Sequence, residues 1–206
     1  MNENSTIRSV AVYCSSSGAL EPHFTDGARV VGRALADSGM AMVYGGGSLG
    51  LMGAAARACK LNGGHVVGII TETLDDLEHG WRGCDELQIV ESMPERRSRM
   101  MEMADAFVIL PGGLGTYEEF FEVLVGRQIG EHGKPIVIVN HDGYYEPLIA
   151  MIDHGIERNF IRPAIREALV VVDVAAEALP SLLAQPRSRH DPAEFLFLPT
   201  EMKVAG

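Results

Sequence analysis

Cysteine is scarce in this 206-residue chain, which has only Cys14, Cys59 and Cys84. An odd number of cysteines without CxxC spacing argues against a disulfide scaffold and against a cysteine zinc site. It is typical of a reduced cytosolic protein. The seven histidines also lack an HExxH pattern and metal-ligand spacing with Cys or Asp. We therefore expect no catalytic transition metal. Magnesium stays open, because it needs only one or two carboxylates and a substrate's own phosphate.

Positive charge and long apolar runs are lacking as well. The chain has 17 Lys and Arg against 28 Asp and Glu, a net charge of -11, and no basic stripe. We therefore expect no binding to nucleic acid or to a charged membrane surface, since both need counterion release by clustered cations. No apolar run approaches the ~18 residues of a membrane span, and the first ten residues contain no apolar signal core. We expect a cytoplasmic protein that holds any phosphate with local donors.

What the chain does have is a regular alternation of short apolar runs and helical patterns. The runs expected as strands lie at 10–14, 40–44, 65–70, 87–90, 106–110, 135–139 and 169–172. Helical patterns lie between them, whereas 71–85 is polar and is expected as a loop or short lid. This alternation predicts an α/β fold of the Rossmann-like, doubly wound type, with a mostly parallel sheet of about seven strands and helices on both faces. We expect one nucleotide-binding domain over 1–184.

The composition changes in the remaining segment, 185–206, which is rich in Pro, Arg, Ser and His. It contains the apolar stretch 195–199, whose exposure to water would be costly. We expect this C-terminal tail to dock on its own domain or on a partner subunit.

One stretch combines a buried strand with a glycine-rich turn and a helix. The run 106–110 is followed by Pro111 and then by Gly112, Gly113 and Gly115. Glycines allow a tight turn and a close approach of backbone N–H groups, and the N-terminus of a helix favours an anion. The stretch therefore predicts a phosphate loop at the carboxyl end of a strand.

Acidic residues follow this loop within one helical turn. Thr116 and Glu119 have the spacing of a capping box, in which Glu119 would only satisfy the backbone at the start of the helix. The alternative is that Glu119 is a catalytic acid or base beside the phosphate donors. Glu118 is expected to be a solvated acid favoured by the helix dipole.

A second glycine loop spans Gly45-x-Gly47-x-x-Gly50 and matches the dinucleotide fingerprint, with Glu72 as a candidate ribose-binding acid. A single match of this kind is weak evidence. It also follows the second expected strand rather than the first, and another glycine loop lies downstream. A whole dinucleotide is therefore a minor alternative.

The helix expected at 93–103 carries an arginine on an apolar face. Arg96 shares this face with Met93, Met100 and Met103 and has no acid at three or four residues' distance. Such a guanidinium must either reach water along the helix surface or find an anion elsewhere in the fold. Both alternatives remain open from the residues alone.

Two of these motifs resemble those of a known family. PGGLGTYEE at 111–119 matches the pattern PGGxGTxxE, and SMPERRSRM at 92–100 resembles a Met-x-Glu-Arg-Lys helix at the expected distance upstream. Together they resemble the LONELY GUY (LOG) proteins, the cytokinin riboside 5'-monophosphate phosphoribohydrolases, which often carry a lysine decarboxylase label. The resemblance extends from about residue 10 to 161 and includes VYCSSSG, VYGGGSLGLMG and NHDGYYEPL.

The resemblance implies a hydrolase that cleaves the N-glycosidic bond of a nucleoside 5'-monophosphate, AMP or an N6-modified AMP such as a cytokinin ribotide. The products would be the free base and ribose 5-phosphate, and no cofactor is implied. Carried over by position, the catalytic pair is Arg96 and Glu119. The substrate contacts are Gly45, Gly46, Gly47, Ser48, Met93, Arg97, Gly112, Gly113, Gly115 and Thr116. The family is usually dimeric, with the site near the subunit interface.

The chain departs from the family at a few positions. Pro94 replaces a frequent His, Arg97 replaces the usual Lys, and Thr71-Glu72 stands where Pro-Glu is common. Arginine keeps the charge of lysine but not its geometry. These departures concern the preferred base more than the reaction.

Two further functions compete with the hydrolase. A non-catalytic nucleotide or cofactor carrier on the same fold would keep the glycines but would need neither Arg96 nor Glu119. A pyridoxal phosphate-dependent decarboxylase would need a lysine for the Schiff base. The lysines are Lys60, Lys134 and Lys203, and none lies in a glycine loop. The joint presence of Arg96 and Glu119 favours the hydrolase.

Overall fold

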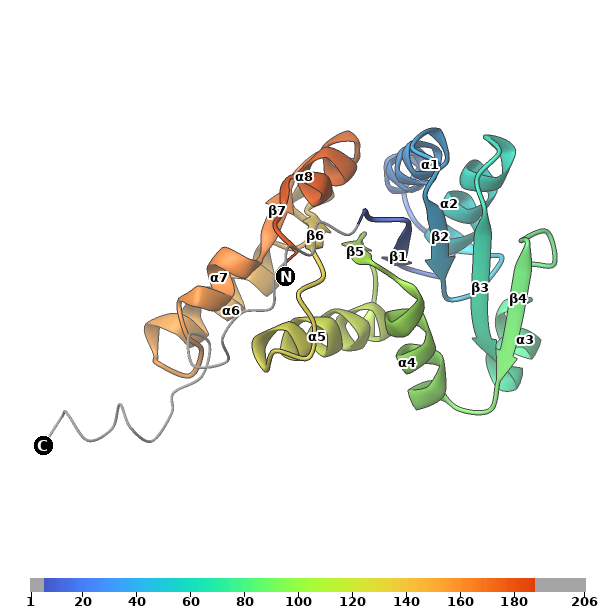
Figure 1. Ribbon diagram of the computed structural model, residues 1–206. Coiled ribbons are helices and arrows are strands. Elements are labelled where there is room, and N and C mark those ends of the chain that lie inside the picture. Colours follow the sequence, from blue (N-terminus) through green and yellow to red (C-terminus); the bar gives the residue numbers. More distant parts are fainter. Residues whose placement is uncertain (1–5, 188–206) are drawn as a thin grey trace, which may run out of the picture.

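The computed structural model describes residues 6–187 and contains one seven-stranded sheet with the strand order β4-β3-β2-β1-β5-β6-β7 (Figure 1). All of its neighbouring strands are parallel, as expected. The strands lie within one or two residues of the predicted runs: β1 (Ser9–Tyr13), β2 (Ala41–Tyr44), β3 (Val66–Thr71), β4 (Glu86–Val90), β5 (Ala106–Ile109), β6 (Ile136–Val139) and β7 (Val170–Val172). The predicted Rossmann-like fold is confirmed.

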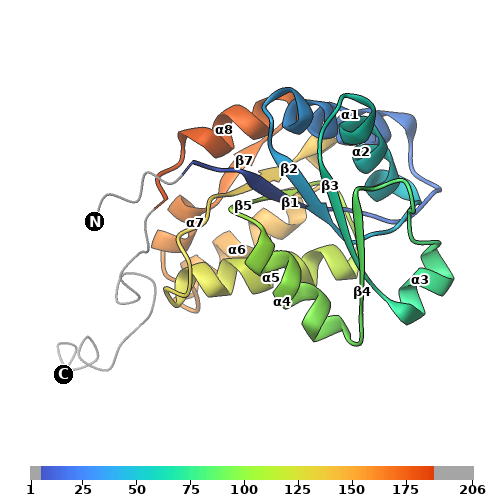
Figure 2. The same ribbon diagram turned by 45° about the vertical axis from the view of Figure 1, so that its right-hand side comes forward.

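Helices cover both faces of this sheet (Figures 1 and 2). One face packs against α1 (Pro22–Asp37), α2 (Gly50–Leu61) and α8 (Ala178–Ala184), which follows the short 3-10 helix η2 (Ala175–Glu177). The other face packs against α4 (Met93–Met103), α5 (Leu114–Gln128), α6 (Glu146–Glu157) and α7 (Ala164–Ala168). Side chains of β1 alternate between the two cores, with Val10 and Val12 in one and Ala11 and Tyr13 in the other. This alternation is the period of two that a strand imposes.

The strand order reverses between β1 and β5. From β1 the chain adds β2, β3 and β4 on one side, and β5, β6 and β7 on the other. In doubly wound sheets ligands bind at the carboxyl ends of the strands beside such a switch point. The loops that leave β1 and β5 span residues 14–21 and 110–113, so the phosphate loop expected from the sequence lies at this position.

The segment 71–85 contains a helix that the sequence analysis did not expect, α3 (Glu72–Glu78). Thr71 caps it, because its Oγ1 accepts a hydrogen bond from the backbone N–H of Leu74 at 3.3 Å. The helix ends at His79 in the left-handed conformation, with φ of 52°. The expectation of a loop or lid was therefore wrong for its first half. The sequence did not reveal this short capped helix, because Leu74 and Leu77 are its only apolar residues.

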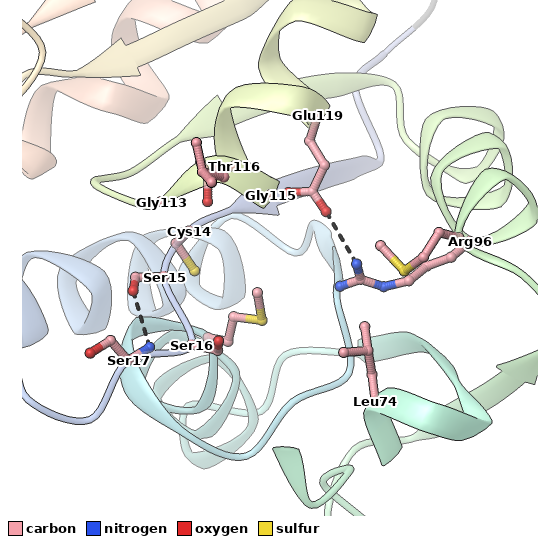
Figure 3. Close-up of a pocket in the computed structure, with 13 residues that line it drawn as sticks. Cys14, Ser15, Ser16, Ser17, Leu74, Arg96, Gly113, Gly115, Thr116 and Glu119 are labelled. Atoms are coloured by element: carbon pink, nitrogen blue, oxygen red, sulfur yellow. Dashed lines mark hydrogen bonds and ion pairs between the residues drawn. The ribbon is translucent and has the colours of Figure 1, made fainter. Parts of the chain in front are cut away.

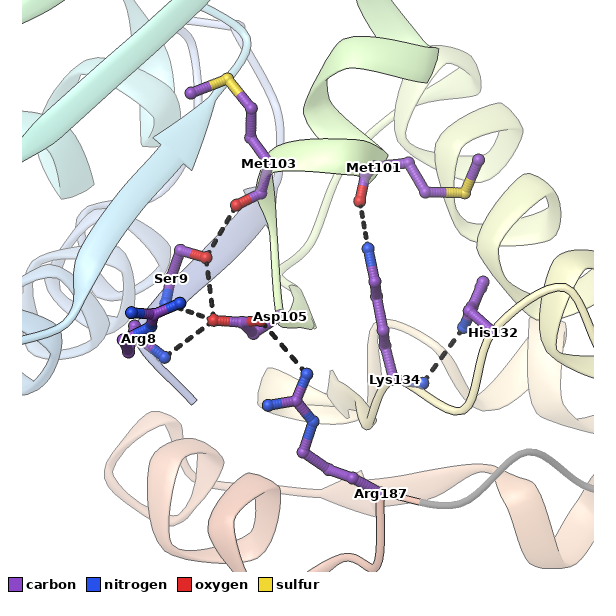
Figure 4. Close-up of polar contacts among 8 residues, drawn as sticks. All are labelled: Arg8, Ser9, Met101, Met103, Asp105, His132, Lys134 and Arg187. Carbon is purple, nitrogen blue, oxygen red and sulfur yellow. Dashed lines mark hydrogen bonds and ion pairs between the residues drawn. The ribbon is translucent and has the colours of Figure 1, made fainter. Parts of the chain in front are cut away.

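The amino ends of the strands form the edge opposite the switch point (Figure 4). Asp105 accepts hydrogen bonds there from the backbone of Arg8 and Ser9 and pairs with Arg187 at 3.1 Å. Gln185 donates from its side chain to the carbonyl oxygen of Ile136 at 3.2 Å. The chain after α8 is thus tied to the start of β5 and β6. The docking predicted for the apolar stretch 195–199 lies outside the described residues.

None of the helices in the described part of the chain combines the length and the apolar character needed to cross a membrane.

Candidate active site

A cavity of about 380 Å³ opens at the switch point, where the loops after β1 and β5 approach α4 and the start of α3 (Figure 3). The side chains and backbone that line this cavity come from elements far apart in the sequence. Its lining consists of Cys14, Ser15, Ser16, Ser17, Met52, Leu74, Met93, Arg96, Gly113, Leu114, Gly115, Thr116 and Glu119. Six of the residues predicted for the site therefore line one cavity: Met93, Arg96, Gly113, Gly115, Thr116 and Glu119.

The N-terminus of α5 supplies one wall of this cavity. Gly113 is the N-cap, and the first helical hydrogen bond runs from the N–H of Tyr117 to the carbonyl oxygen of Gly113 at 3.0 Å. The amides of Leu114, Gly115 and Thr116 precede that bond, and no acidic residue occupies the first turn. Free amides and the positive end of the helix dipole favour an anion. This wall suits a phosphate, as the sequence predicts.

Close packing explains the glycine at the centre of the turn. A Cβ on Gly112 would lie 2.1 Å from Oγ1 of Thr116, so only glycine lets the turn fold back on the helix. Tyr144 fixes the same turn by donating from its hydroxyl to the carbonyl oxygen of Gly112 at 2.6 Å. Gly112 shapes the loop but does not line the cavity.

Of the two alternatives for Glu119, the capping box with Thr116 is wrong. The helix begins at Leu114, because Gly113 adopts the extended N-cap conformation and makes no side-chain cap. Thr116 therefore lies inside the first turn, and Glu119 is one turn too late to cap it. Glu119 instead is buried and points into the cavity (Figure 3).

The loop after β1 supplies the opposite wall with Ser15, Ser16 and Ser17, which were not among the predicted site residues. The start of α2 holds this loop, since the amides of Leu51 and Met52 both donate to the carbonyl oxygen of Ser15, at 2.9 and 3.2 Å. The available sequence signal was the position of a loop of small polar residues directly after the first strand.

Gly50 lets the start of α2 approach the serine loop. Its φ is 56°, and a Cβ there would lie 2.5 Å from the carbonyl oxygen of Ser17. The last glycine of the second glycine loop therefore serves the serine loop through backbone packing.

Arg96 is the buried cation of the cavity. Its Nε donates to the carbonyl oxygen of Ile69 at 3.0 Å, and its Nη2 donates to that of Gly45 at 3.2 Å. A Cβ on Gly45 would lie 2.0 Å from that Nη2, so the first glycine of the second loop makes room for the guanidinium. Of the two alternatives left open for Arg96, the structure shows an acid elsewhere in the fold, because its Nη1 lies 3.5 Å from Oε1 of Glu119.

The carboxyl group of Glu119 changes its protonation state near neutral pH. Burial raises its pKa from 4.5 to about 7, and the neighbouring carboxylates of Glu118 and Glu122 also raise it. Arg96 and Arg97 lower it, but less than burial raises it. A carboxyl group whose pKa lies near the working pH suits acid or base catalysis.

Cys14 lies in the same cavity but does not suit a nucleophile. Burial raises the pKa of its thiol far above the usual range, and the negative charge of Glu119 adds to that effect. Because the thiolate is the reactive form, this thiol is inert.

The remaining predicted contacts lie outside the lining of the cavity. Gly46 accepts a hydrogen bond from the amide of Trp81 at 2.8 Å, Gly47 forms a β-bridge with Gly80, and Ser48 accepts from Arg57 at 3.0 Å. The loop 45–48 thus makes hydrogen bonds and a β-bridge to other parts of the protein, and it does not line the cavity. Arg97 lies on α4 facing α5, in contact with Glu118 and Glu122.

The described residues place neither a group of three metal ligands nor a lysine at this cavity. Within 6–187, no three or more His, Cys, Asp or Glu residues are grouped as metal ligands. Lys60 pairs with Asp85, and Nζ of Lys134 donates to the carbonyl oxygen of Met101 at 2.6 Å (Figure 4). Neither lysine lines the cavity, and Lys203 lies beyond the described residues.

Known proteins resemble this chain in sequence over most of its length. The profile of a family described as "Possible lysine decarboxylase" matches residues 52–182. A cytokinin riboside 5'-monophosphate phosphoribohydrolase of Rhodococcoides fascians is 42% identical over 167 residues, 81% of this chain and 84% of the relative. A protein of the same name from Arabidopsis thaliana is 39% identical over 180 residues, 87% of this chain and 84% of the relative.

A solved structure shares the fold. The molybdenum cofactor carrier protein of Chlamydomonas reinhardtii superposes with a TM-score of 0.66 over 87% of this chain and 100% of that protein. The sequences are 20% identical, so this likeness concerns the fold alone.

Proposed function

The chain belongs to the family of cytokinin riboside 5'-monophosphate phosphoribohydrolases, the LOG proteins, and we propose from that premise that it hydrolyses nucleoside 5'-monophosphates at the N-glycosidic bond. The protein is a hydrolase, and its products are the free base and ribose 5-phosphate. AMP or an N6-modified AMP is the substrate class. The apolar side chains of Met52, Leu74 and Met93 on the cavity wall suit an apolar N6 substituent.

One observation carries this proposal: the buried pair of Arg96 and Glu119 lies on the same cavity as two loops of hydrogen-bond donors. A protein that only holds a nucleotide has no need for an ionisable carboxyl group whose pKa lies near 7 in a buried position. Burying such a group costs stability and is retained where it serves chemistry.

The phosphate binds between the N-terminus of α5 and the serine loop. Gly113, Gly115 and Thr116 offer backbone amides, and Ser15 to Ser17 offer hydroxyl groups from the other side. Fixing the phosphate there places the ribose deeper in the cavity, toward Glu119. Gly112 and the loop Gly45 to Ser48 support this arrangement by shape and backbone contacts, and Met93 contacts the nucleotide from α4.

The reaction breaks the bond between C1' of the ribose and a nitrogen of the base. Its electron pair stays on the base, which takes up a proton from the solvent, and positive charge develops on the sugar. Ionised Glu119 stabilises that charge and accepts a proton from the water that attacks C1'. Arg96 keeps Glu119 oriented and partly ionised while its own geometry is fixed by the carbonyl oxygens of Ile69 and Gly45.

The carrier alternative is the second candidate, because carriers of molybdenum cofactor share the fold. Nothing beyond the fold favours it here. The decarboxylase label of the matching family profile requires a lysine at the site, and the two lysines within the described residues are held elsewhere.

We further propose that residues 1–184 form a single nucleotide-binding domain and that the protein is a cytoplasmic homodimer without nucleic acid or membrane partners. The net charge of -11 argues against a polyanionic partner. The homodimer is what the family resemblance implies.

The test is to incubate the protein with AMP and with N6-prenylated AMP and to separate the products by chromatography. The proposal expects free base and ribose 5-phosphate in equal amounts from at least one of them. Measurable binding of several nucleotides without release of base would instead establish the carrier.

A further inference from the structure

Arg97 connects the two helices that carry the catalytic pair. It lies on α4 next to Arg96, and its side chain is 17% exposed. Its Nη1 lies 2.9 Å from Oε1 of Glu118, and its Nε lies 3.0 Å from Oε2 of Glu122 without the alignment of a hydrogen bond. Both carboxylates belong to α5 and flank Glu119 in sequence. Two neighbouring arginines of α4 therefore reach the same turn of α5.

We propose that Arg97 is a positioning residue whose two ion pairs hold α4 against α5 and so keep Arg96 beside Glu119. Arg97 does not line the cavity and is not a ligand of the substrate in this proposal. The inference rests on the proposed function in one respect: it assigns Arg97 a part in the same site.

The geometry explains why arginine, rather than the lysine usual in the family, occupies this position. Glu118 and Glu122 are four residues apart on α5, so they lie one above the other on one helix face. The guanidinium presents separate nitrogens to the two carboxylates, whereas an ammonium is a single point charge. Lysine would therefore contact one carboxylate well and leave the other poorly paired.

The same contacts act on the charge of Glu119. The charged and titratable groups that face it are Arg96 and Arg97 from α4, Glu118 and Glu122 from α5, Tyr13 and Cys14 from β1 and its loop, and Tyr145 from the start of α6. Glu118 and Glu122 raise the pKa of Glu119, and Arg97 lowers it. Without Arg97 the two carboxylates would be uncompensated, and the pKa of Glu119 would rise.

The experiment compares R97Q and R97K with the matched control R99Q. Arg99 lies on the same helix and pairs with Glu95 at 3.2 Å, but on the exposed side. R97Q is expected to lower kcat by about 10-fold to 100-fold, as misplacement of catalytic groups does, with little change in KM. R97K is expected to fall between R97Q and the wild type, and R99Q to match the wild type.

A second measurement does not depend on activity. Carbon-13 NMR of glutamate-labelled protein, with E119Q to assign the signal, follows the titration of Glu119 without substrate. R97Q is expected to move this titration to higher pH, and the triple variant R97Q/E118Q/E122Q is expected to move it back while kcat stays low. R97K, the conservative replacement, keeps the test valid if R97Q unfolds.

Two results would overturn the proposal. A rise in KM with an unchanged titration of Glu119 in R97Q would make Arg97 a substrate contact. Equal behaviour of R97Q and R99Q would make it an ordinary surface residue. Absence of any hydrolysis, with the titration still shifted in R97Q, would instead refute the proposed function and leave the positioning role standing.

Discussion

Nη1 of Arg96 lies 3.5 Å from Oε1 of Glu119, and both side chains are buried at the point where the strand order of the sheet reverses. Neither residue is beside the other in sequence or on the same helix. Arg96 is further fixed by two backbone carbonyl oxygens, so its position is set before any ligand binds. The pair is therefore a prearranged unit.

Gly45→Ala is expected to disable the site by sterics. The new Cβ would lie 2.0 Å from Nη2 of Arg96, so the guanidinium must leave its position. We expect a loss of about 100-fold in kcat, and of roughly 1 to 3 kcal/mol in the free energy of unfolding from the overpacked core. Steady-state kinetics and urea denaturation measure the two effects.

Gly18→Ala is the matched control, because a Cβ at Gly18 meets nothing within 4 Å. It should leave kcat unchanged. Equal, small effects of both substitutions would show that the position of Arg96 does not matter for catalysis.

The buried carboxyl group of Glu119 also predicts how stability depends on pH. Its pKa is raised from 4.5 to about 7 in the folded protein, so the folded state binds this proton more tightly than the unfolded state. Its contribution to stability is therefore present at low pH and is lost as pH rises from about 4.5 to 7. Relative to E119Q, the wild type should lose on the order of 1 to 3 kcal/mol between pH 5 and pH 8.

Urea denaturation of both proteins at pH 5 and pH 8 gives this difference directly, and effects common to both proteins cancel. If the difference in the free energy of unfolding were the same at the two pH values, Glu119 would not titrate in this range.

The N-terminus of α5 and the loop with Ser15 to Ser17 both offer hydrogen-bond donors, so we expect the rate of hydrolysis to depend strongly on the 5'-phosphate of the substrate. A charge-assisted hydrogen bond contributes roughly 1.5 to 3 kcal/mol, so losing even two of them costs about 100-fold or more in kcat/KM. Adenosine should therefore be hydrolysed at least about 100-fold less efficiently than AMP, and inorganic phosphate should compete with AMP. Similar kcat/KM values for the two substrates would place the phosphate away from α5 and the serine loop.

Local patterns in the sequence predicted the sheet and α4, whereas the pair of Arg96 and Glu119 was predicted through the family resemblance. Buried parallel strands are continuous apolar runs, and β5 and β6 match theirs closely. The helix α4 occupies the predicted 93–103, because Ser92 caps it by accepting from the amide of Glu95 at 3.3 Å. Arg96 lacked a partner on its own helix, and from that absence alone both water and an anion elsewhere in the fold stayed possible.

Other features depend on contacts that no local pattern records. The capping box failed because its spacing occurs at Thr116 and Glu119 while the helix begins at Leu114. Gly45 belongs to a sequence match with the nucleotide fingerprint, but glycine is required there because a side chain would collide with the guanidinium of Arg96. That guanidinium comes from a helix distant in sequence. Likewise Arg97 was expected to contact substrate, and only the packing of α4 on α5 reveals Glu118 and Glu122 as its partners.

Glu119 is proposed to act in the chemical step, and the nucleotide is expected to bind even when this carboxylate is removed. The most direct test measures, on E119Q, both the rate of free base release from the preferred nucleotide and the affinity for that nucleotide by calorimetry. We expect release to fall roughly 10²- to 10⁴-fold while the affinity changes little. An E119Q protein that releases base at the rate of the wild type would contradict the account.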